Sequence, residues 1–306
     1  MNSASHPNST TASRRPGLFI IFLAFAGLLS MWSFNYVAGK TALRFMDGLT
    51  LGTFRIQLAA LIILPFYFLN RSRAPLRARD LWTLSYLGFF LCLNQLFFTI
   101  GLSFTTSGHS AMILAMGPII VLVFAHFLKL ESLTAAKISG MTIACAGVSI
   151  LATEQGLDIR HSATLAGDLL TLLATTSFAC YVVLGKRVAR QYDSISMNTV
   201  NLVASSLLLL PFTIRQAIHL DWGSVSWMGW VGLFYMAAIS SVAAYTLFYW
   251  VLRFMEASRV AAVNYLQPIG ALLVARAFLA EVPTRQLLAG GALILLGVYL
   301  AERGRG

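Results

Sequence analysis

Apolar residues run in ten blocks along the chain after residue 17, and short polar segments separate the blocks. Each block holds about 20 residues, the length that a helix needs to cross a hydrocarbon core of about 30 Å. The pattern predicts ten membrane-spanning helices, over residues 18–40, 50–70, 80–102, 107–129, 134–152, 165–187, 197–215, 228–252, 259–280 and 284–301. Because the connections are short, we expect consecutive helices to be antiparallel neighbours, with any function inside the bundle.

The first 17 residues, MNSASHPNSTTASRRPG, are polar and rich in Ser and Thr, which predicts disorder. Arg14 and Arg15 before an apolar run resemble the front of a signal peptide. That run is longer than the apolar core of a signal peptide and has no obvious small-residue cleavage site before its own polar end. We therefore expect it to remain as the first span.

Composition and charge agree with a membrane protein. The chain is 58% hydrophobic and 11% charged, with a mean hydropathy of +0.76. If the N-terminus is cytoplasmic, the inner loops and inner helix ends hold 15 of the 22 basic residues, which the positive-inside rule favours. The net charge of +11 is then mostly a topology signal, with anionic lipid headgroups as a secondary partner. No nucleic-acid partner is expected.

The chain repeats itself. A shift of 150 residues aligns several identical positions, among them Phe104 with Phe254, Pro118 with Pro268, Glu131 with Glu281, Gly140 with Gly290 and Gly147 with Gly297. A shift of 146 aligns Gly39 and Lys40 with Gly185 and Lys186, and Asp47 with Asp193. Each half holds five predicted spans, an odd number, so the second half enters the membrane from the opposite side. Such inverted repeats are typical of alternating-access transporters.

Three stretches resemble a known family. WSFNYVAGKTALRFMDGLTLGTFRIQLAALIILP is similar to the opening of an EamA domain, and GLSFTTSGHSAMILAMGPIIVLVFAHFLKLESLTAAKISGMTIACAGVSIL to its close. The closing pattern returns as ASRVAAVNYLQPIGALLVARAFLAEVPTRQLLAGGALILLGVYL. The chain thus resembles the drug/metabolite transporter (DMT) superfamily, most of all its YddG-like amino-acid and metabolite exporters. It departs from the pattern at Asn201, which stands where the first half has Arg55.

The resemblance implies an all-α integral membrane protein with two inverted five-helix EamA repeats. The first repeat is expected over residues 18–152 and the second over residues 165–302, after a cytoplasmic N-terminal segment over residues 1–17. It also implies ten helices, cytoplasmic termini and export of small metabolites across a bacterial inner membrane.

Polar and aromatic residues inside the spans are candidates for a cavity lining, because polar groups in hydrocarbon need a partner or a wet face. Asn264 and Gln267 are three residues apart and share one helix face. The predicted substrate-binding set is Trp32, Ser33, Tyr36, Asn94, Gln95, Phe98, Met112, Met116, Thr175, Phe178, Tyr181, Tyr245, Tyr249, Asn264 and Gln267. Amides also tie membrane helices together, and aromatic residues also anchor at interfaces, so a structural role stays open for each residue.

A neutral, amide-bearing and aromatic lining suits a small zwitterion or a neutral metabolite with an apolar side chain. It suits a phosphorylated substrate poorly, since such ligands usually call for buried Arg or Lys. We expect the available cations, Lys40, Arg55 and Arg276, to reach the outer surface instead.

Energy coupling and gating are less marked in the sequence. The acids Glu131, Asp168 and Glu281 and the histidines His109 and His126 all lie toward span ends, which favours facilitated or weakly coupled export. Pro118 and Pro268 are candidate hinges, because each removes a backbone hydrogen bond; static kinks are the alternative.

Other functions are less well supported. The chain has no HExxH motif, no paired central aspartates and no Cys/His grouping, so we expect neither an enzyme nor a metal or other cofactor. Within transport, a broad drug or toxicant exporter and a nucleotide-sugar or sugar-phosphate carrier remain alternatives. Ten helices can enclose a cavity alone, so a monomer is the simplest expectation.

Overall fold

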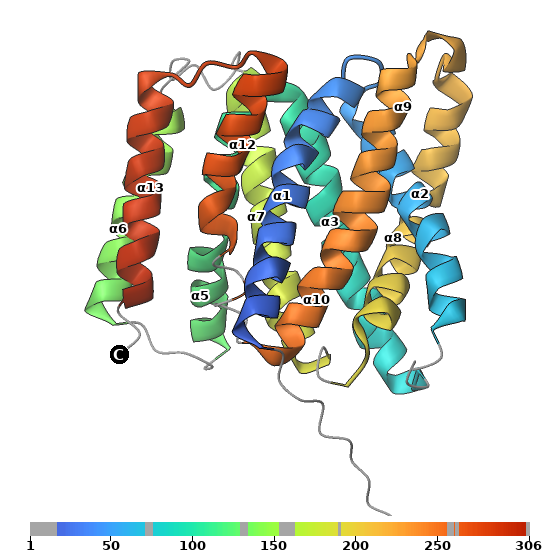
Figure 1. Cartoon of the computed structure of the whole chain (residues 1–306), viewed down its shortest axis with the longest axis horizontal. Coiled ribbons are helices and arrows are strands. Elements are labelled where there is room, and N and C mark those ends of the chain that lie inside the picture. The colour runs from blue at the N-terminus through green and yellow to red at the C-terminus, as the bar shows by residue number, and fades with distance from the viewer. Residues whose placement is uncertain are drawn as a thin grey trace, which may run out of the picture.

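The computed structural model describes residues 17–70, 76–128, 134–152, 163–188, 191–255, 260 and 263–303. Over these residues every regular element is a helix, and the helices stand side by side in one bundle (Figure 1). The first helix begins and the last helix ends at the lower face of the bundle in Figure 1. We call this the lower face and the opposite end the upper face. The expected disorder of the N-terminal segment concerns residues that, apart from Gly17, lie outside the described part.

The helices follow the predicted spans closely. They are α1 (Leu18–Ala42), α2 (Gly48–Leu69), α3 (Ala78–Phe104), α4 (Ser107–Leu114), α5 (Gly117–Phe127), α6 (Ala135–Ala152), α7 (Ala163–Val188), α8 (Ser194–His219), the 3-10 helix η1 (Trp222–Ser224), α9 (Trp227–Phe234), the π-helix η2 (Tyr235–Ala243), α10 (Ala244–Phe254), α12 (Val263–Leu279) and α13 (Arg285–Arg303).

The membrane character of the bundle is plain from length and exposure. Among the described residues, seven stretches are long and apolar enough to cross a membrane, and Ala135–Ile150, Leu266–Leu279 and Arg285–Leu300 are shorter apolar helices. Large apolar side chains stand exposed on the outside of the bundle, such as Trp82 at 83% and Leu69 at 78%. Acyl chains can cover such surfaces at no hydrophobic cost. An all-α, multi-pass membrane protein is confirmed.

The fourth predicted span, residues 107–129, is broken in the structure. Helix α4 ends at Leu114, and α5 begins at Gly117 with Pro118 in its first turn. Proline has no N–H, and its ring blocks the carbonyl four residues earlier, which here belongs to Leu114. The proline therefore ends one helix and begins the next.

The eighth predicted span is one continuous column of three elements, α9, η2 and α10, whose middle nine residues are a π-helix. The wider π-turn rotates the following side chains relative to a regular helix, and such segments occur often at functional sites. Here it sets the direction of Ser241, whose hydroxyl also reaches the backbone oxygen of Met236 at 2.9 Å.

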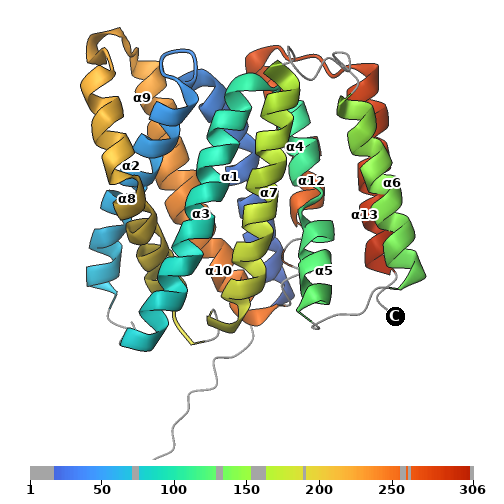
Figure 2. The ribbon, with the colours of Figure 1, turned by 180° about the vertical axis from the view of Figure 1, so that it is seen from behind.

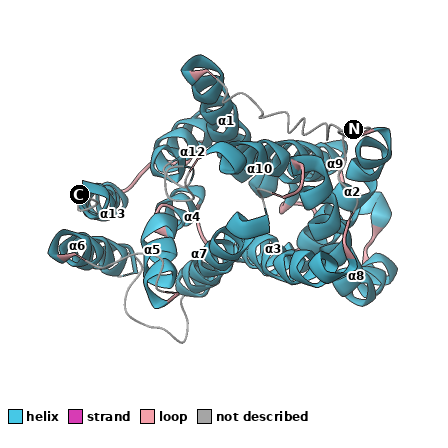
Figure 3. Cartoon of the chain, turned by 90° about the horizontal axis from the view of Figure 1, so that it is seen from below, coloured by secondary structure: helices cyan, strands magenta, loops and turns pink. Residues whose placement is uncertain are grey.

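Exchange of the two halves maps the helix contacts onto one another, as an inverted repeat requires (Figures 2 and 3). The packing of α3 on α7 has its counterpart in the packing of α1 on α9, η2 and α10. The packing of α1 on α12 corresponds to that of α7 on α4 and α5, whereas α2 packs on its own counterpart α8, and α6 on α13.

The pair α6 and α13 shows the exchange at single residues. A Cβ on Gly147 would lie 2.5 Å from the backbone oxygen of Gly290, and a Cβ on Gly297 would lie 2.4 Å from that of Gly140. Glycine is therefore required at both crossings, because only its absent side chain lets the two backbones approach so closely. These are the glycines that the shift of 150 residues aligns.

Two further aligned pairs cap helices in both halves. Asp47 accepts hydrogen bonds from the N–H groups of Leu49 (2.9 Å) and Thr50 (3.0 Å) at the start of α2, and Asp193 accepts one from Ser196 (2.9 Å) at the start of α8. At the C-terminus of α3, Lys40 of α1 donates to the backbone oxygen of Thr105 (2.5 Å). Lys186 donates to that of Met255, the aligned position.

A lysine at a helix C-terminus stabilises the helix dipole, by about 0.3–1 kcal/mol at exposed sites. Lys40 is half-buried at the end of α1, where its ammonium caps α3.

Candidate functional site

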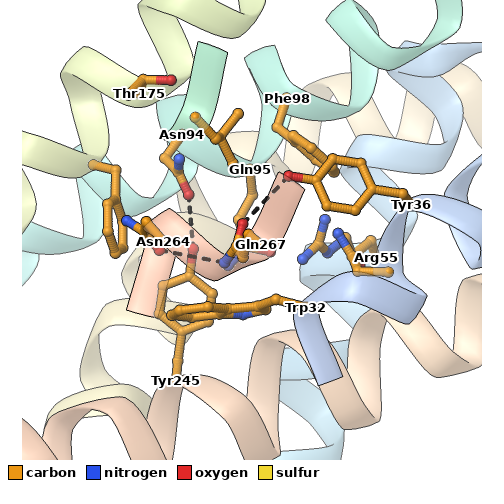
Figure 4. A pocket seen from close by; sticks show the side chains of 13 residues that line it. Trp32, Tyr36, Arg55, Asn94, Gln95, Phe98, Thr175, Tyr245, Asn264 and Gln267 are labelled. Carbon is orange, nitrogen blue, oxygen red and sulfur yellow. Dashed lines mark hydrogen bonds between the residues drawn. The ribbon is translucent and has the colours of Figure 1, made fainter. Parts of the chain in front are cut away.

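A cavity of about 50 Å³ lies in the middle of the bundle, smaller than the roughly 300–1,000 Å³ typical of pockets that hold drug-sized ligands. Side chains from both halves surround it (Figure 4). It is lined by Trp32, Asn35, Tyr36, Arg55, Asn94, Gln95, Phe98, Leu114, Thr175, Phe178, Tyr245, Asn264 and Gln267. All but Leu114 are buried.

The amides of α12 hold one wall of the cavity together with α1. Gln267 Nε2 donates to Asn264 Oδ1 at 3.3 Å, and the Tyr36 hydroxyl donates to Gln267 Oε1 at 3.3 Å. Asn264 and Gln267 are one helical turn apart, so both point inward (Figure 4). The amide of Asn264 also approaches the break between α4 and α5, because a Cβ on Gly117 would lie 3.4 Å from Asn264 Nδ2.

A second set of hydrogen bonds crosses the cavity from α10 to α7. The hydroxyl of Tyr245 donates to Asn94 Oδ1 at 2.7 Å, and Asn94 Nδ2 donates to the backbone oxygen of Ala174 at 3.0 Å. Asn94 therefore fixes α3 between the two second-half helices, and its amide has little freedom to turn.

Arg55 is the one charged residue among the lining residues, and it is 3% exposed. Its Nε donates to Ser241 Oγ at 2.9 Å, and the Ser241 hydroxyl in turn lies 2.8 Å from Gln95 Oε1. The expectation that Arg55 extends to the outer surface is wrong. Its backbone lies about 10 Å inside α2, at 1.5 Å per residue from Gly48, and its side chain turns toward the bundle axis, where it donates to Ser241.

Aromatic rings close the cavity toward each face. Below it, Trp32 lies against Phe178 at 6.2 Å and against Tyr245 at 5.7 Å between ring centroids. Phe248 completes this group, 5.8 Å from Trp32. Above it, Tyr36 meets Phe98 edge to face at 5.5 Å. Phe98 above the cavity and Phe248 below it are equivalent under the repeat, whereas Trp32 and Phe178, which are also equivalent, both lie in the lower group.

The structure brings ten of the fifteen predicted site residues together around the cavity: Trp32, Tyr36, Asn94, Gln95, Phe98, Thr175, Phe178, Tyr245, Asn264 and Gln267. The prediction missed Asn35, Arg55 and Leu114. Asn35 had a signal in the sequence, because it lies three residues after Trp32 on the same helix face.

The other five predicted residues lie away from the cavity. Ser33 follows Trp32 by about 100° around α1 and packs against Gly270 of α12. Met112 and Met116 point to the other side of the broken span, into a cluster with Leu287 and Ile294 of α13.

Tyr181 and Tyr249 lie below the aromatic closure, where they surround Asn201. Asn201 Nδ2 lies 2.7 Å from the Tyr249 hydroxyl and 3.5 Å from that of Tyr181. These contacts explain why an asparagine, and not an arginine, stands at the position equivalent to Arg55. The neighbours of Asn201 are the neutral phenol groups of Tyr181 and Tyr249, which a neutral amide can pair with.

The side chains of His109 and Asp168 are buried against each other, although both residues lie toward span ends. Asp168 Oδ2 lies 3.0 Å from His109 Nδ1, and Asp168 Oδ1 accepts from the Thr105 hydroxyl at 2.6 Å. The two side chains are 3% and 9% exposed and join α4 to α7 near the upper face, outside the cavity lining.

The two prolines take different places in their helices. Pro118 lies in the first turn of α5, whereas Pro268 lies inside α12 and is buried. Motion about either residue stays a prediction.

Comparisons with known proteins agree with the repeat. The model of the EamA-like transporter family matches residues 18–153 and again residues 165–302. A probable amino-acid metabolite efflux pump of Salmonella typhimurium is 26% identical over 94% of this chain and 95% of its own length. An uncharacterized transporter of Archaeoglobus fulgidus is 25% identical over 93% and 99%. One solved crystal structure aligns with a TM-score of 0.64 at 16% identity, over 93% of this chain and 98% of the other, a likeness of fold alone.

Proposed function

The chain belongs to the EamA-like transporter family, and from this premise we propose that it exports small neutral or zwitterionic metabolites by alternating access. Amino acids, including those with aromatic or apolar side chains, are the proposed substrates. The proposed site of action is a bacterial inner membrane, with both termini and the lower face on the cytoplasmic side. One chain encloses the cavity, so we propose a monomer as the working unit.

The observation that carries this proposal is the cavity between the two halves, with aromatic residues above and below it that include the equivalent pair Phe98 and Phe248. A site on the axis of an inverted repeat can open to either face when one half rocks against the other. Opening the lower closure would admit a substrate from the cytoplasm, and opening the upper one would release it.

The chemistry of the lining supports amino acids. Amide groups of Asn94, Gln95, Asn264 and Gln267 can bind carboxylate and ammonium groups, while the rings of Trp32 and Phe178 can contact an apolar side chain. The name of the Salmonella relative, a probable amino-acid metabolite efflux pump, points the same way. A broad drug exporter would use the same aromatic surfaces and is the main alternative, and a nucleotide-sugar or sugar-phosphate carrier is another.

Purified protein in liposomes preloaded with a labelled panel of amino acids tests the proposal. Efflux above that of empty liposomes is expected for aromatic and large apolar amino acids. Asn264→Leu installs the residue that the first half has at the equivalent position, Leu114, and should lower the efflux severalfold. Gln286→Leu removes an exposed amide on α13 and is the matched control.

Efflux of no amino acid, together with efflux of hydrophobic drugs or of sugar phosphates, would replace the proposed substrate by one of the alternatives. The same assay with and without a pH gradient measures coupling. Weak coupling predicts a less than severalfold change, because the lining residues include no Asp, Glu or His.

A further inference from the structure

Three polar atoms of the cavity residues have no hydrogen-bond partner among the described residues, although each is buried. They are Arg55 Nη1, Gln95 Nε2 and Asn35 Oδ1, on side chains that are 3%, 1% and 6% exposed. A buried donor or acceptor without a partner costs free energy, and most for a charged group. The other buried atoms of this kind belong to Ser33, Asn198, Thr199 and Asn201, which do not line the cavity.

The two free donors are held by a shared anchor. Ser241 accepts from Arg55 Nε at 2.9 Å and lies 2.8 Å from Gln95 Oε1. The contact with Ser241 uses Gln95 Oε1, so the amide of Gln95 keeps Nε2 as a donor without a partner. Arg55 donates to Ser241 through Nε, and its Nη1 has no partner. Figure 4 shows the guanidinium of Arg55 directed toward Gln95 and Gln267.

The charge of Arg55 has no counter-ion in the cavity lining. No Asp or Glu is among the lining residues, and the position equivalent to Arg55 in the second half is the neutral Asn201. An anionic group of a ligand would therefore meet one cation, on one side of the cavity. Guanidinium groups bind carboxylates with strong, directional hydrogen bonds, and an amide N–H beside one can bind the second carboxylate oxygen.

The remaining unpaired atom, Asn35 Oδ1, is an acceptor. A ligand ammonium is a donor only, so it can bind this oxygen but not the arginine. The cavity thus offers a cationic donor pair and a separate neutral acceptor, an arrangement that suits a group with one carboxylate and one ammonium.

We propose that Arg55 and Gln95, held by Ser241, form the carboxylate subsite of the cavity, so that the transporter selects monocarboxylate substrates over otherwise equal amines and amides. This inference rests on the proposed function, which it deepens by naming the substrate group that is bound. The amides of Asn264 and Gln267 on α12 then contact the rest of the substrate.

The test compares ligands that differ in one group. Thermal stabilisation of the purified full chain in detergent is titrated with L-phenylalanine, L-phenylalaninamide, which lacks the carboxylate, and 3-phenylpropionate, which lacks the ammonium. For the wild type, phenylalanine should bind about tenfold or more tightly than its amide, the effect of a hydrogen bond to a charged group. Arg55→Met should bring the two affinities within about twofold, and Arg55→Lys should keep part of the preference.

Arg276→Met removes an exposed cation from α12 and should leave the preference unchanged. The ratio of the two affinities is the readout, so a general loss of stability in a variant does not imitate the effect. If Arg55→Met cannot be purified, the wild-type ratio and the Arg55→Lys ratio still decide.

Equal binding of phenylalanine and its amide by the wild type would overturn the inference, as would an Arg55→Met variant that keeps the preference, or a wild type that no carboxylate stabilises. Tenfold tighter binding of phenyl phosphate than of 3-phenylpropionate would overturn the choice of a carboxylate. If 3-phenylpropionate binds more tightly than phenylalaninamide but liposomes show no amino-acid efflux, the carboxylate subsite is supported and amino acids are rejected as substrates.

Discussion

At the scale of single residues, hydrogen bonds between helices decide which polar groups face the cavity and which do not. Tyr245 donates to Asn94, and Arg55 donates to Ser241, so among the described cavity residues only Arg55, Gln95 and Asn35 keep a buried polar atom without a partner. Asp168 is tied in the same way to His109 and Thr105, but outside the cavity, where its role is to join α4 with α7.

Asp168→Ala should destabilise the protein by about 3 kcal/mol, because it removes the acceptor of two buried groups. Unfolding of the purified protein in detergent measures the change. Asp221→Ala, which removes an exposed carboxylate that accepts one hydrogen bond from Gly223, should cost less than about 1 kcal/mol. Equal losses for the two variants would show that the buried pair contributes no more than a surface cap.

At the scale of elements, the aligned residues of the two halves do the same structural work on opposite faces. Asp47 and Asp193 begin the second helix of each half, and Lys40 and Lys186 end the third. The repeat is therefore preserved at helix ends and at close crossings, while the cavity lining differs between the halves, as at Arg55 and Asn201.

Asp47→Ala and Asp193→Ala should each cost about 1 kcal/mol of stability, the usual effect of removing an N-cap. For Asp47 the loss depends on pH. Partial burial alone raises the pKa of Asp47, but hydrogen bonds from the Thr50 hydroxyl and from the N–H groups of Thr50 and Leu49 outweigh it and lower the pKa below 3.8.

A carboxyl with a lowered folded-state pKa stabilises the fold above its unfolded pKa, and this contribution is lost as the pH falls through the lowered value. The difference in stability between wild type and Asp47→Ala should thus be constant from pH 7 to about pH 5 and shrink below about pH 4. A difference that grows with acidity would contradict the capping role.

Gly147→Ala should separate α6 from α13, because the added methyl would meet the backbone oxygen of Gly290 at 2.5 Å. We expect a loss of about 1–3 kcal/mol, the range for overpacked sites, in detergent unfolding. Gly185→Ala is the matched control, since its nearest side-chain atom would lie 3.7 Å away and helix propensity favours alanine. Similar losses in both would mean that the glycine crossing is not closely packed.

Much of this architecture could be predicted from the sequence, because hydropathy and helix length act locally. Over the described residues, all helices except the short η1 coincide with the ten predicted spans to within a few residues. The apolar block over residues 107–129 predicts a continuous span, although the break at Pro118 follows from local chemistry. The hydropathy pattern does not predict the π-helix, since no single residue type encodes it.

The cavity lining was predicted only in part, because it depends on the rotation of each helix about its axis. An error of one residue turns a side chain by about 100°, which is the difference between Trp32 and Ser33. At Arg55 the prediction was wrong because the sequence gives only the distance of Arg55 from the helix end. It does not show that Arg55 donates to the hydroxyl of Ser241 on another helix.

At the scale of the whole molecule, the two aromatic closures are the parts that must open in turn. Phe98 with Tyr36 closes the cavity above, and Phe248 with Trp32 and Phe178 closes it below. Because the exchange of halves relates Phe98 to Phe248, weakening one closure should favour opening toward that face at the expense of the other.

Phe98→Ala should raise access to the cavity from the upper face, and Phe248→Ala access from the lower face. The measurement uses Thr175→Cys, a cavity position, in a chain whose cysteines Cys92, Cys145 and Cys180 are replaced. Labelling by a membrane-impermeant thiol reagent, added on one side of sealed vesicles, should increase severalfold on opposite sides for the two variants. An increase on the same side for both would contradict paired gates.

The glycine crossing of α6 with α13 also has a consequence for how the chain is made. Helix α6 packs mainly against α13, which begins 133 residues after α6 ends. At about 5–20 residues per second, α6 waits in the bilayer for on the order of ten seconds with Gly140 and Gly147 facing lipid. During this interval the glycine face of α6 can pack against α6 of another nascent chain. Misassembly is therefore expected to be most frequent when ribosomes are crowded at the membrane.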